Sequence, residues 1–233
     1  MERIYLDHAA TSPTDPRVVE KMLPYLTENF GNPSSIHSFG RESRKWLDGT
    51  RELIAREIGA HPNEIVFTSG GTEADNMAIL GNALAREQQG RHIITTKIEH
   101  HAVLHTCNRL EEMGFDVTYL DVDESGRISA EQVKDALRDD TILVTVMYGN
   151  NEVGTIQPID EIGDLLKDHR ALFHTDAVQA FGFLPIDVRK NRIDMMSVSG
   201  HKLNGPKGTG FLYVNENVKP VSYTHLTLPT TPY

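Results

Sequence analysis

The feature that most constrains the fold is a regular alternation of short apolar runs with amphipathic stretches from about residue 50 onward. The run 141–148 is nearly all apolar or β-branched, as expected of a strand that is buried on both faces. Residues 72–86 place Met77, Leu80 and Leu84 on one helical face. Strands that alternate with helices predict an α/β fold, with a mostly parallel, doubly wound sheet and helices on both faces.

The individual elements follow from the same periodicity. One expected helix opens at Ser129, where Gln132 three residues further on completes a capping-box pattern. The other expected helices cover 72–86, 102–113 and 159–167, and the expected strands cover 64–68, 92–96, 117–120, 141–148, 171–175, 195–198 and 210–214.

The first 45 residues differ from the rest of the chain. They are rich in Pro, Ser, Gly and His, most of all at 31–41 (GNPSSIHSFGR), and show few helix or strand signals. Two interpretations stay open: a surface arm, or an ordered loop that lines a site, because loops held by a rigid scaffold often carry binding groups. We expect 1–45 to form an N-terminal arm and substrate-side loop, and 46–220 to form one large domain.

Composition argues against several classes of protein. The formal charge of −10 argues against a surface for nucleic acid, which needs clustered Lys and Arg. A single cysteine allows no internal disulfide and favours a reducing compartment, so the cytoplasm is the expected location. No signal-peptide stretch follows Met1, and no run approaches the ~20 apolar residues of a membrane span.

Polar motifs follow several of the expected strands, at the edge where open α/β sheets bind ligands. The first, SGGTE at 69–73, lies between a strand and a helix. Its two glycines allow close backbone approach to an anion, and the helix N-terminus offers free N–H groups. The alternative is a tight turn with a helix cap. The chain contains neither GxGxxG nor GxxxxGK[ST], so a dinucleotide fingerprint and a P-loop are both excluded.

Two further motifs hold polar side chains at strand ends. His100 can stack on a flat cofactor or act in acid–base chemistry. Its neighbours His101 and His105 stand four residues apart without a third ligand at a sensible spacing, so we expect no metal site. Asn151 follows the strand 141–148, where the alternative interpretation is a turn.

The strongest motif combines an acid and a lysine. Asp176 follows the strand 171–175, and the strand 195–198 runs into a Ser-Gly-His-Lys loop that ends at Lys202. A pyridoxal phosphate (PLP) site requires this pair, because the amine forms a Schiff base and the acid keeps the pyridine nitrogen protonated. Spacing alone suggests such a site without deciding it.

Residues 5–214 resemble the N-terminal part of cysteine desulfurases, within the class V aminotransferase family of fold type I PLP enzymes. So many blocks in the same order do not match by chance. The blocks that carry the resemblance are YLDHAATSPTDPRV (5–18), GNPSSIHSFGR (31–41), FTSGGTEADN (67–76), EHHAV (99–103), NNEVGTIQP (150–158), HTDAVQ (174–179) and SGHKLNGPKGTG (199–210).

The resemblance implies a role for each candidate residue. Lys202 and His100 would be catalytic: Lys202 would bind PLP covalently and move protons, and His100 would stack over the ring. Asp176 would pair with the pyridine nitrogen. The remaining contacts would be polar groups around the ring and phosphate: Asn151 and Gln179 near the phenolic oxygen, and Gly71, Thr72, Ser199 and His201 in a phosphate cup.

The resemblance also implies the reaction and the partners. L-cysteine would be converted to L-alanine after a protein cysteine attacks its sulfur. The resulting persulfide would pass to an iron–sulfur cluster scaffold or a tRNA-thiolation protein. A cytoplasmic homodimer is expected, without direct contact to nucleic acid or membrane.

Two departures from the family pattern bear on activity. The attacking cysteine of the family lies beyond the region present here, and Cys107 sits in an expected helix, where packing is its expected role. Residues 221–233 contain no Asp, Glu, Lys or Arg and do not continue the family pattern, so we expect a non-native tail and a missing small C-terminal domain. This chain is therefore expected to be inactive in desulfuration.

Two alternatives remain open at this point. A related class V enzyme, such as an aminotransferase or selenocysteine lyase, would share the lysine and the acid. The blocks GNPSSIH and EHHAV favour the desulfurase. The other alternative is an inactive PLP-binding fragment.

Overall fold

One sheet organises the molecule, for which a computed structural model describes residues 3–218. Its strand order is β1-β7-β6-β5-β4-β2-β3. The strands are β1 (Ile65–Thr68), β2 (His92–Thr96), β3 (Asp116–Leu120), β4 (Thr141–Thr145), β5 (Leu172–Asp176), β6 (Met195–Ser199) and β7 (Gly210–Val214).

The sheet is mostly parallel, which confirms the predicted fold class. Strands β3, β2, β4, β5 and β6 pair in parallel, whereas β7 is antiparallel to both β6 and β1. The antiparallel β7 follows β6 after a short loop, because a strand that folds straight back needs no helical crossover.

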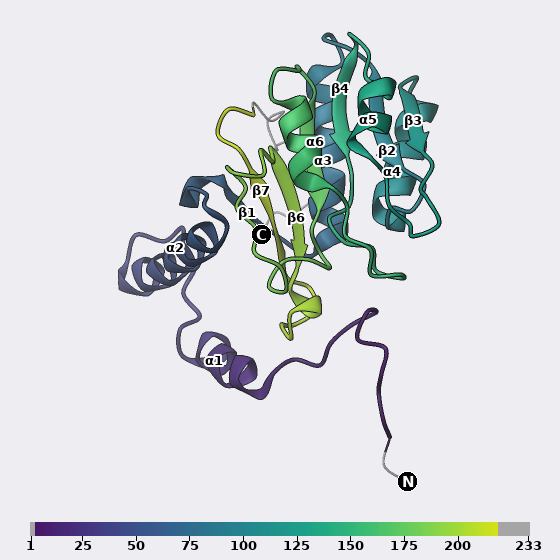
Figure 1. The fold of residues 1–233 in the computed structure, drawn as a ribbon. Coiled ribbons are helices and arrows are strands. Elements are labelled where there is room, and N and C mark those ends of the chain that lie inside the picture. Colours follow the sequence, from purple (N-terminus) through teal and green to yellow (C-terminus); the bar gives the residue numbers. More distant parts are fainter. Residues whose placement is uncertain (1–2, 219–233) are drawn as a thin grey trace.

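Helices cover both faces of this sheet (Figure 1). On one face lie α3 (Gly71–Arg86) and α4 (His101–Glu112), and on the other lie α5 (Ala130–Ala136) and α6 (Ile159–Leu166). The capping box predicted at Ser129 is present, since the Ser129 hydroxyl accepts from the Gln132 amide and the Gln132 side chain accepts from the Ser129 amide.

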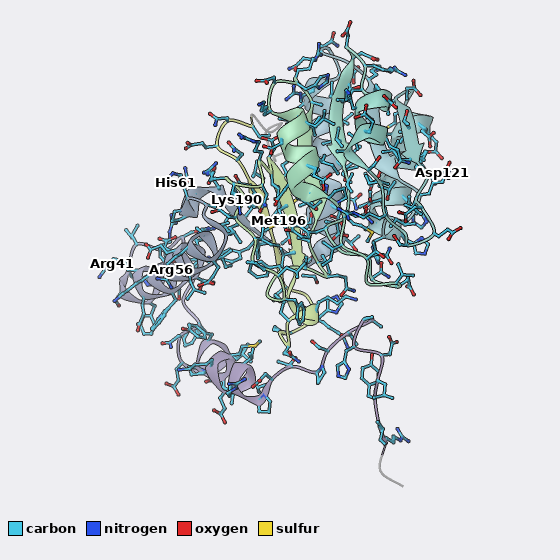
Figure 2. The ribbon with its side chains drawn as sticks, in the orientation of Figure 1. Arg41, Arg56, His61, Asp121, Lys190 and Met196 are labelled. Carbon is cyan, nitrogen blue, oxygen red and sulfur yellow. The ribbon has the colours of Figure 1, made fainter. Side chains whose placement is uncertain are left out.

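Two apolar cores follow from the period-two alternation of the strands. In β4, Leu143 packs with α3 and α4, while the adjacent Val144 packs with α6 on the opposite face. The same division separates Met195 from Met196 in β6. Met196 lies within the body of the sheet in Figure 2. Each central strand is therefore buried on both sides, as its continuous apolar sequence predicts.

The strand predicted at 141–148 is too long, because β4 ends at Thr145. Val146 and Tyr148 still donate backbone hydrogen bonds to β5, to the carbonyls of His174 and Asp176. The amide between them, that of Met147, donates instead to Glu99 Oε1 at 3.0 Å. A side chain thus takes the donor that would have extended the pairing toward β2.

The prediction of few helices in the first 45 residues is wrong. All of α1 (Pro16–Thr27) and the start of α2 (Ser38–Ile58) lie there. The Asp15 side chain accepts from the Arg17 amide at 2.8 Å, and proline occupies the first helical position. An acidic N-cap before proline is a helix-start signal that the Pro- and Ser-rich composition concealed.

Both helices lie to one side of the sheet body in Figure 1. Arg41 lies at the outer edge of α2 in Figure 2, and Arg56 of the same helix is exposed. α1 contains no buried residue. The expected boundary at residue 45 falls inside α2, and the domain division stays a prediction. The expected tail, 221–233, lies outside the described residues.

None of the helices within residues 3–218 combines the length and the apolar character needed to cross a membrane.

The packing of α4 gives a testable expectation. Leu110 is fully buried against α3 and the sheet, whereas Leu84 is 38% exposed. Leu110→Ala should lower the free energy of unfolding by about 2–5 kcal/mol, because it leaves a cavity. Leu84→Ala, the matched control, should cost less than about 1 kcal/mol. Urea unfolding curves measure both, and equal losses would contradict the assignment of this core.

Candidate active site

A cavity of about 400 Å³ opens where β5 and β6 end beside the first turn of α3. Parallel strands that end at one edge bring their following loops together there, which is where open α/β sheets bind ligands. The residues predicted to bind the cofactor all line this cavity: Gly71, Thr72, His100, Asn151, Asp176, Gln179, Ser199, His201 and Lys202. Their functional roles stay predictions.

Lys202 enters the cavity from a short 3-10 turn, Gly200–Lys202, directly after β6. Its Nζ donates hydrogen bonds to the backbone carbonyls of Ala9 and Ala10, the latter at 3.0 Å. Burial lowers the pKa of the Lys202 amine, against the opposing effect of Asp176 and other carboxylates. A lowered pKa raises the fraction of neutral amine, the nucleophilic form.

The loop around Lys202 is tightly folded for a steric reason. A Cβ on Gly200 would lie 2.5 Å from Thr209 Oγ1, and one on Gly205 would lie 2.7 Å from the Gly200 carbonyl oxygen. Lys207, the other lysine of this loop, is exposed in a turn and does not line the cavity. Of the two lysines in this tight loop, Lys202 lines the cavity and Lys207 lies outside it.

Asp176 is the last residue of β5 and is only 5% exposed. Its Oδ1 accepts a hydrogen bond from the Val178 amide at 2.9 Å. Burial raises the pKa of Asp176, while the Val178 amide, His100 and Lys202 act in the opposite direction. A buried carboxyl in this position gains from a cation brought into the cavity.

The first turn of α3 forms the opposite wall. Gly70 has φ +153°, a conformation that favours glycine, and a Cβ on Gly71 would lie 2.7 Å from Val178 Cγ2. The amides of a first helical turn have no partner within the helix, and the helix dipole makes this end positive. Ser199 and His201 approach from the β6 side. The arrangement suits an anionic group, such as a phosphate.

His100 caps the N-terminus of α4. Its Nδ1 accepts from the Ala102 amide at 3.1 Å, which fixes the ring and leaves Nε2 as the N–H of the neutral form. His101 and His105 stack on each other at 5.4 Å, outside the cavity. Within residues 3–218, no three His, Cys, Asp or Glu side chains gather so as to hold a metal ion.

Glu99, beside His100, is a buried residue that the sequence did not single out. Its Oε1 accepts from Thr96 Oγ1 at 2.7 Å and from the Met147 amide at 3.0 Å. Burial raises the pKa of Glu99 to about 8. The acid therefore ties the loop after β2, which carries His100, to the end of β4.

The two asparagines after β4 have separate tasks. Asn150 builds the turn, since its Oδ1 accepts from the Glu152 and Val153 amides at 2.9 Å and its Nδ2 donates to the Ile98 carbonyl. Asn151 lines the cavity instead. The turn and the site interpretations of this motif thus each apply to one of the two residues.

The N-terminal arm completes the wall with Asp7, Ala9 and Ala10, which sequence reasoning missed. The Ser12 hydroxyl donates to the His201 carbonyl at 2.7 Å, and Gln179 Nε2 donates to the Ala9 carbonyl at 3.0 Å. Residues 31–41, expected on the substrate side, do not line the cavity. Residues 31–37 lead into α2 and 38–41 form its first turn, where Gly40 packs directly on the Ser35 carbonyl. Of the two interpretations of the arm, the cavity-lining one applies to 7–10.

Cys107 lies within α4 and is fully buried in the core between α3, α4 and the sheet. Burial raises the pKa of its thiol to about 12. It does not line the cavity. The predicted packing role is confirmed.

Nearly the whole chain is similar to proteins of one family. The aminotransferase class-V family model matches residues 4–225. A Bacillus subtilis (strain 168) protein that carries the name of a cysteine desulfurase is 76% identical over 219 residues, which are 94% of this chain and 58% of that protein. A cysteine desulfurase of Methanosarcina thermophila is 56% identical over 216 residues, 93% of this chain and 54% of that protein.

Solved structures share the fold as well as the sequence. The structure of SspA in complex with cysteine superimposes with a TM-score of 0.91 at 48% identity, covering 94% of this chain and 64% of that one. The apo structure of a cysteine desulfurase from Thermococcus onnurineus NA1 gives 0.84 at 32% identity, covering 91% and 54%. The chain spans a little over half the length of the curated relatives it matches.

The close contact at Gly71 can be tested without any ligand. Gly71→Ala should lower the free energy of unfolding by about 1–3 kcal/mol, because its methyl group overlaps Val178. Val178→Ala should recover part of this loss in the double variant, measured by urea unfolding. Gly49→Ala is the control: nothing lies within 4 Å of its added Cβ, so this helical alanine should stabilise slightly. An equal loss of unfolding free energy from Gly71→Ala in the wild type and in Val178→Ala would refute the contact.

Proposed function

This chain belongs to the aminotransferase class-V family, and we propose that it forms the cofactor-binding large domain of a PLP-dependent cysteine desulfurase. The observation that carries the proposal is the convergence of Lys202, Asp176 and the N-terminus of α3 on one cavity. Relatives that are 76% and 56% identical to this chain carry the name of cysteine desulfurases.

PLP is the cofactor of this family, as the resemblance implied, and the residues present fit it. The cavity holds an amine with a lowered pKa, a buried carboxyl and a helix N-terminus with glycines in close backbone contact. These groups match an aldehyde, a pyridine nitrogen and a phosphate. PLP bound there would supply an electron sink for the carbon beside the substrate amine.

Each wall of the cavity then has a task. The amides of Gly71 and Thr72, with Ser199 and His201, would hold the phosphate. Asp176 would retain a proton on the pyridine nitrogen, because a buried carboxylate favours a neighbouring cation.

The remaining residues act on the ring and on protons. His100, whose ring is fixed by its capping hydrogen bond, would cover the face of the cofactor. Asn151 and Gln179 would direct amide groups to its phenolic oxygen. Lys202 would hold the cofactor covalently. After the substrate amine takes its place, the released Nζ would move the proton of the substrate α-carbon.

The proposed substrate is L-cysteine, and the proposed products are L-alanine and a protein persulfide. SspA, whose solved structure contains cysteine, supports this substrate class. Cys107 does not suit the attack on the substrate sulfur, since its thiol is buried, protonated and outside the cavity. The sulfur-accepting cysteine would therefore come from a part of the enzyme that this chain lacks.

We further propose that the enzyme acts as a cytoplasmic homodimer. The single cysteine favours a reducing compartment. The N-terminal region exposes large apolar side chains, with Leu26 at 70%, Phe30 at 68% and Ile36 at 91%, and a second copy would cover such a surface. The proposed sulfur acceptor is an iron–sulfur cluster scaffold or a tRNA-thiolation protein.

The attachment of PLP to Lys202 can be tested by borohydride reduction of the chain mixed with PLP, followed by peptide mapping. The label should lie on the peptide that contains Lys202. Lys202→Ala should abolish the label, whereas Lys207→Ala, its control in the same loop, should keep it, because Lys207 is exposed outside the cavity. A label on Lys207 would disprove the assignment.

The role of Cys107 has a separate test. The chain incubated with PLP and L-cysteine should form neither alanine nor protein persulfide at a catalytic rate, because a thiolate must come within about 3–3.5 Å of the substrate sulfur. Alanine and persulfide are measured with and without Cys107→Ser. Turnover that disappears in Cys107→Ser would make Cys107 the nucleophile and overturn this part of the proposal.

A further inference from the structure

Asp75 is a buried acid in the cavity wall that the proposed function does not use. It lies one turn into α3 and is 1% exposed, yet it lines the same cavity as Asp176. Its Oδ1 has no hydrogen-bond partner. An ionised carboxylate buried in this way requires a cation or several donors, so its charge state needs an explanation.

The charges around Asp75 are mostly of its own sign. Asp176 on β5 and Glu99 in the loop after β2 are both buried, and their carboxylates disfavour a charge on Asp75. Lys202 and His100 favour the charge on Asp176. Burial is the first cause that raises the pKa of Asp75, and only a hydrogen bond with Ser197 of β6 lowers it.

The other elements packed on α3 bring no cation to Asp75. α4 contributes Cys107, whose thiol stays protonated. β4 and β7 contribute Leu143 and Leu212.

His174 of β5 is the one basic side chain within 4.0 Å of the Asp75 carboxyl among the described residues, with its Nε2 3.7 Å from Asp75 Oδ1. That distance exceeds a hydrogen bond. The ring already pairs with two hydroxyls, Thr145 Oγ1 at 2.8 Å and Ser197 Oγ at 2.9 Å, which satisfies a neutral imidazole. Complete burial lowers the pKa of His174 to about 3. A charged pair of Asp75 and His174 would lose the hydration of both ions without a direct hydrogen bond.

We propose that Asp75 is a positioning residue that stays a neutral acid beside Asp176, and so leaves Asp176 as the one ionised carboxylate of this buried pair. This role rests on the proposed function, since one negative charge is what a single pyridinium nitrogen requires. Two adjacent carboxylates cannot both stay ionised without compensation. If Asp75 did not hold the proton, Asp176 would take it and could no longer pair with the cofactor.

The test compares Asp75→Asn with the wild type by urea unfolding without PLP, between about pH 5 and pH 8. An acid with a raised folded-state pKa stabilises fully below its unfolded pKa, and this stability is lost as pH rises toward the folded value. Asparagine does not titrate. Asp75→Asn should therefore gain stability relative to the wild type as pH rises, by up to about tenfold in the unfolding equilibrium constant per pH unit.

A charged Asp75–His174 pair predicts a different origin for any trend. Asp75 would then have a lowered pKa and stay ionised in both states across this range, so only His174 would titrate. The gain of Asp75→Asn would then disappear when both chains carry His174→Gln, whereas it should persist there if Asp75 itself titrates. Disappearance of the gain in the His174→Gln background, or a flat difference, would overturn the proposal. The matched control is Asp139→Asn, at an exposed position, which should show no such trend. In an Asp176→Asn background the gain near neutral pH should shrink, because the like charge beside Asp75 is gone.

Infrared spectroscopy of the wild type with labelled aspartate covers the case in which Asp75→Asn does not fold. The carbonyl stretch of a protonated aspartate should be present at neutral pH, and its absence would overturn the proposal without any variant.

A last measurement separates this inference from the proposed function. Asp176→Asn should weaken PLP binding at least about tenfold, since about 1.4 kcal/mol of charge pairing is lost per pKa unit. Unchanged PLP binding there would refute the proposed cofactor role of Asp176, whereas the unfolding experiment would still decide the charge of Asp75.

Discussion

The close packing of α3 across the middle of the sheet is the interaction on which the cavity depends. Its buried face consists largely of small residues, with Ala74, Ala78 and Ala83 all within 1% of complete burial. At its start, a Cβ on Gly210 of β7 would lie 2.8 Å from the Gly70 Cα. Small side chains therefore let the helix approach the strands closely. This approach places the amides of its first turn opposite Asp176 and Lys202.

The same close packing explains why two acids of the cavity wall are buried from solvent. α3 covers the ends of β5 and β6, so Asp75 and Asp176 share an interior in which each charge must be compensated. His174 and Ser197 carry polar groups on the same face of the sheet, and they satisfy each other at 2.9 Å. The helix whose N-terminus lines the cavity thus also limits how many charges the opposite wall can hold.

The central strands and the position of the site could be predicted from the sequence, because apolar periodicity and strand-end motifs are local signals. Asp176 and Lys202 each follow an apolar strand directly, so the edge rule for parallel sheets brings them together. Asp75 and the carbonyls of Ala9 and Ala10 gave no such signal. Asp75 lies inside a helical pattern where an acid is ordinarily solvated, and the arm meets Lys202 through backbone carbonyls, which no side-chain pattern predicts.

The errors have equally local causes. The strand 141–148 was extended too far because its composition continues past Thr145, while the end of pairing is set by Glu99, a residue distant in the sequence. α1 was missed because Pro and Ser outweighed the cap at Asp15. In both cases a backbone amide donates a hydrogen bond to a side-chain carboxyl at the boundary, and composition could not show that contact.

The N-terminal arm occupies the Lys202 amine with hydrogen bonds, so it competes with any group that would bind covalently to that nitrogen. An ammonium group has three donors, and two of them now serve the carbonyls of Ala9 and Ala10. A nitrogen joined covalently to another group keeps at most one hydrogen in a double-bonded link, so it cannot serve both carbonyls. The arm would therefore lose at least one of these two hydrogen bonds when Lys202 is joined to another group, while it stays attached through Ser12, Asn204 and the bond from Gln179 to the Ala9 carbonyl. The first residues of the chain thus report on the state of a lysine nearly two hundred residues later.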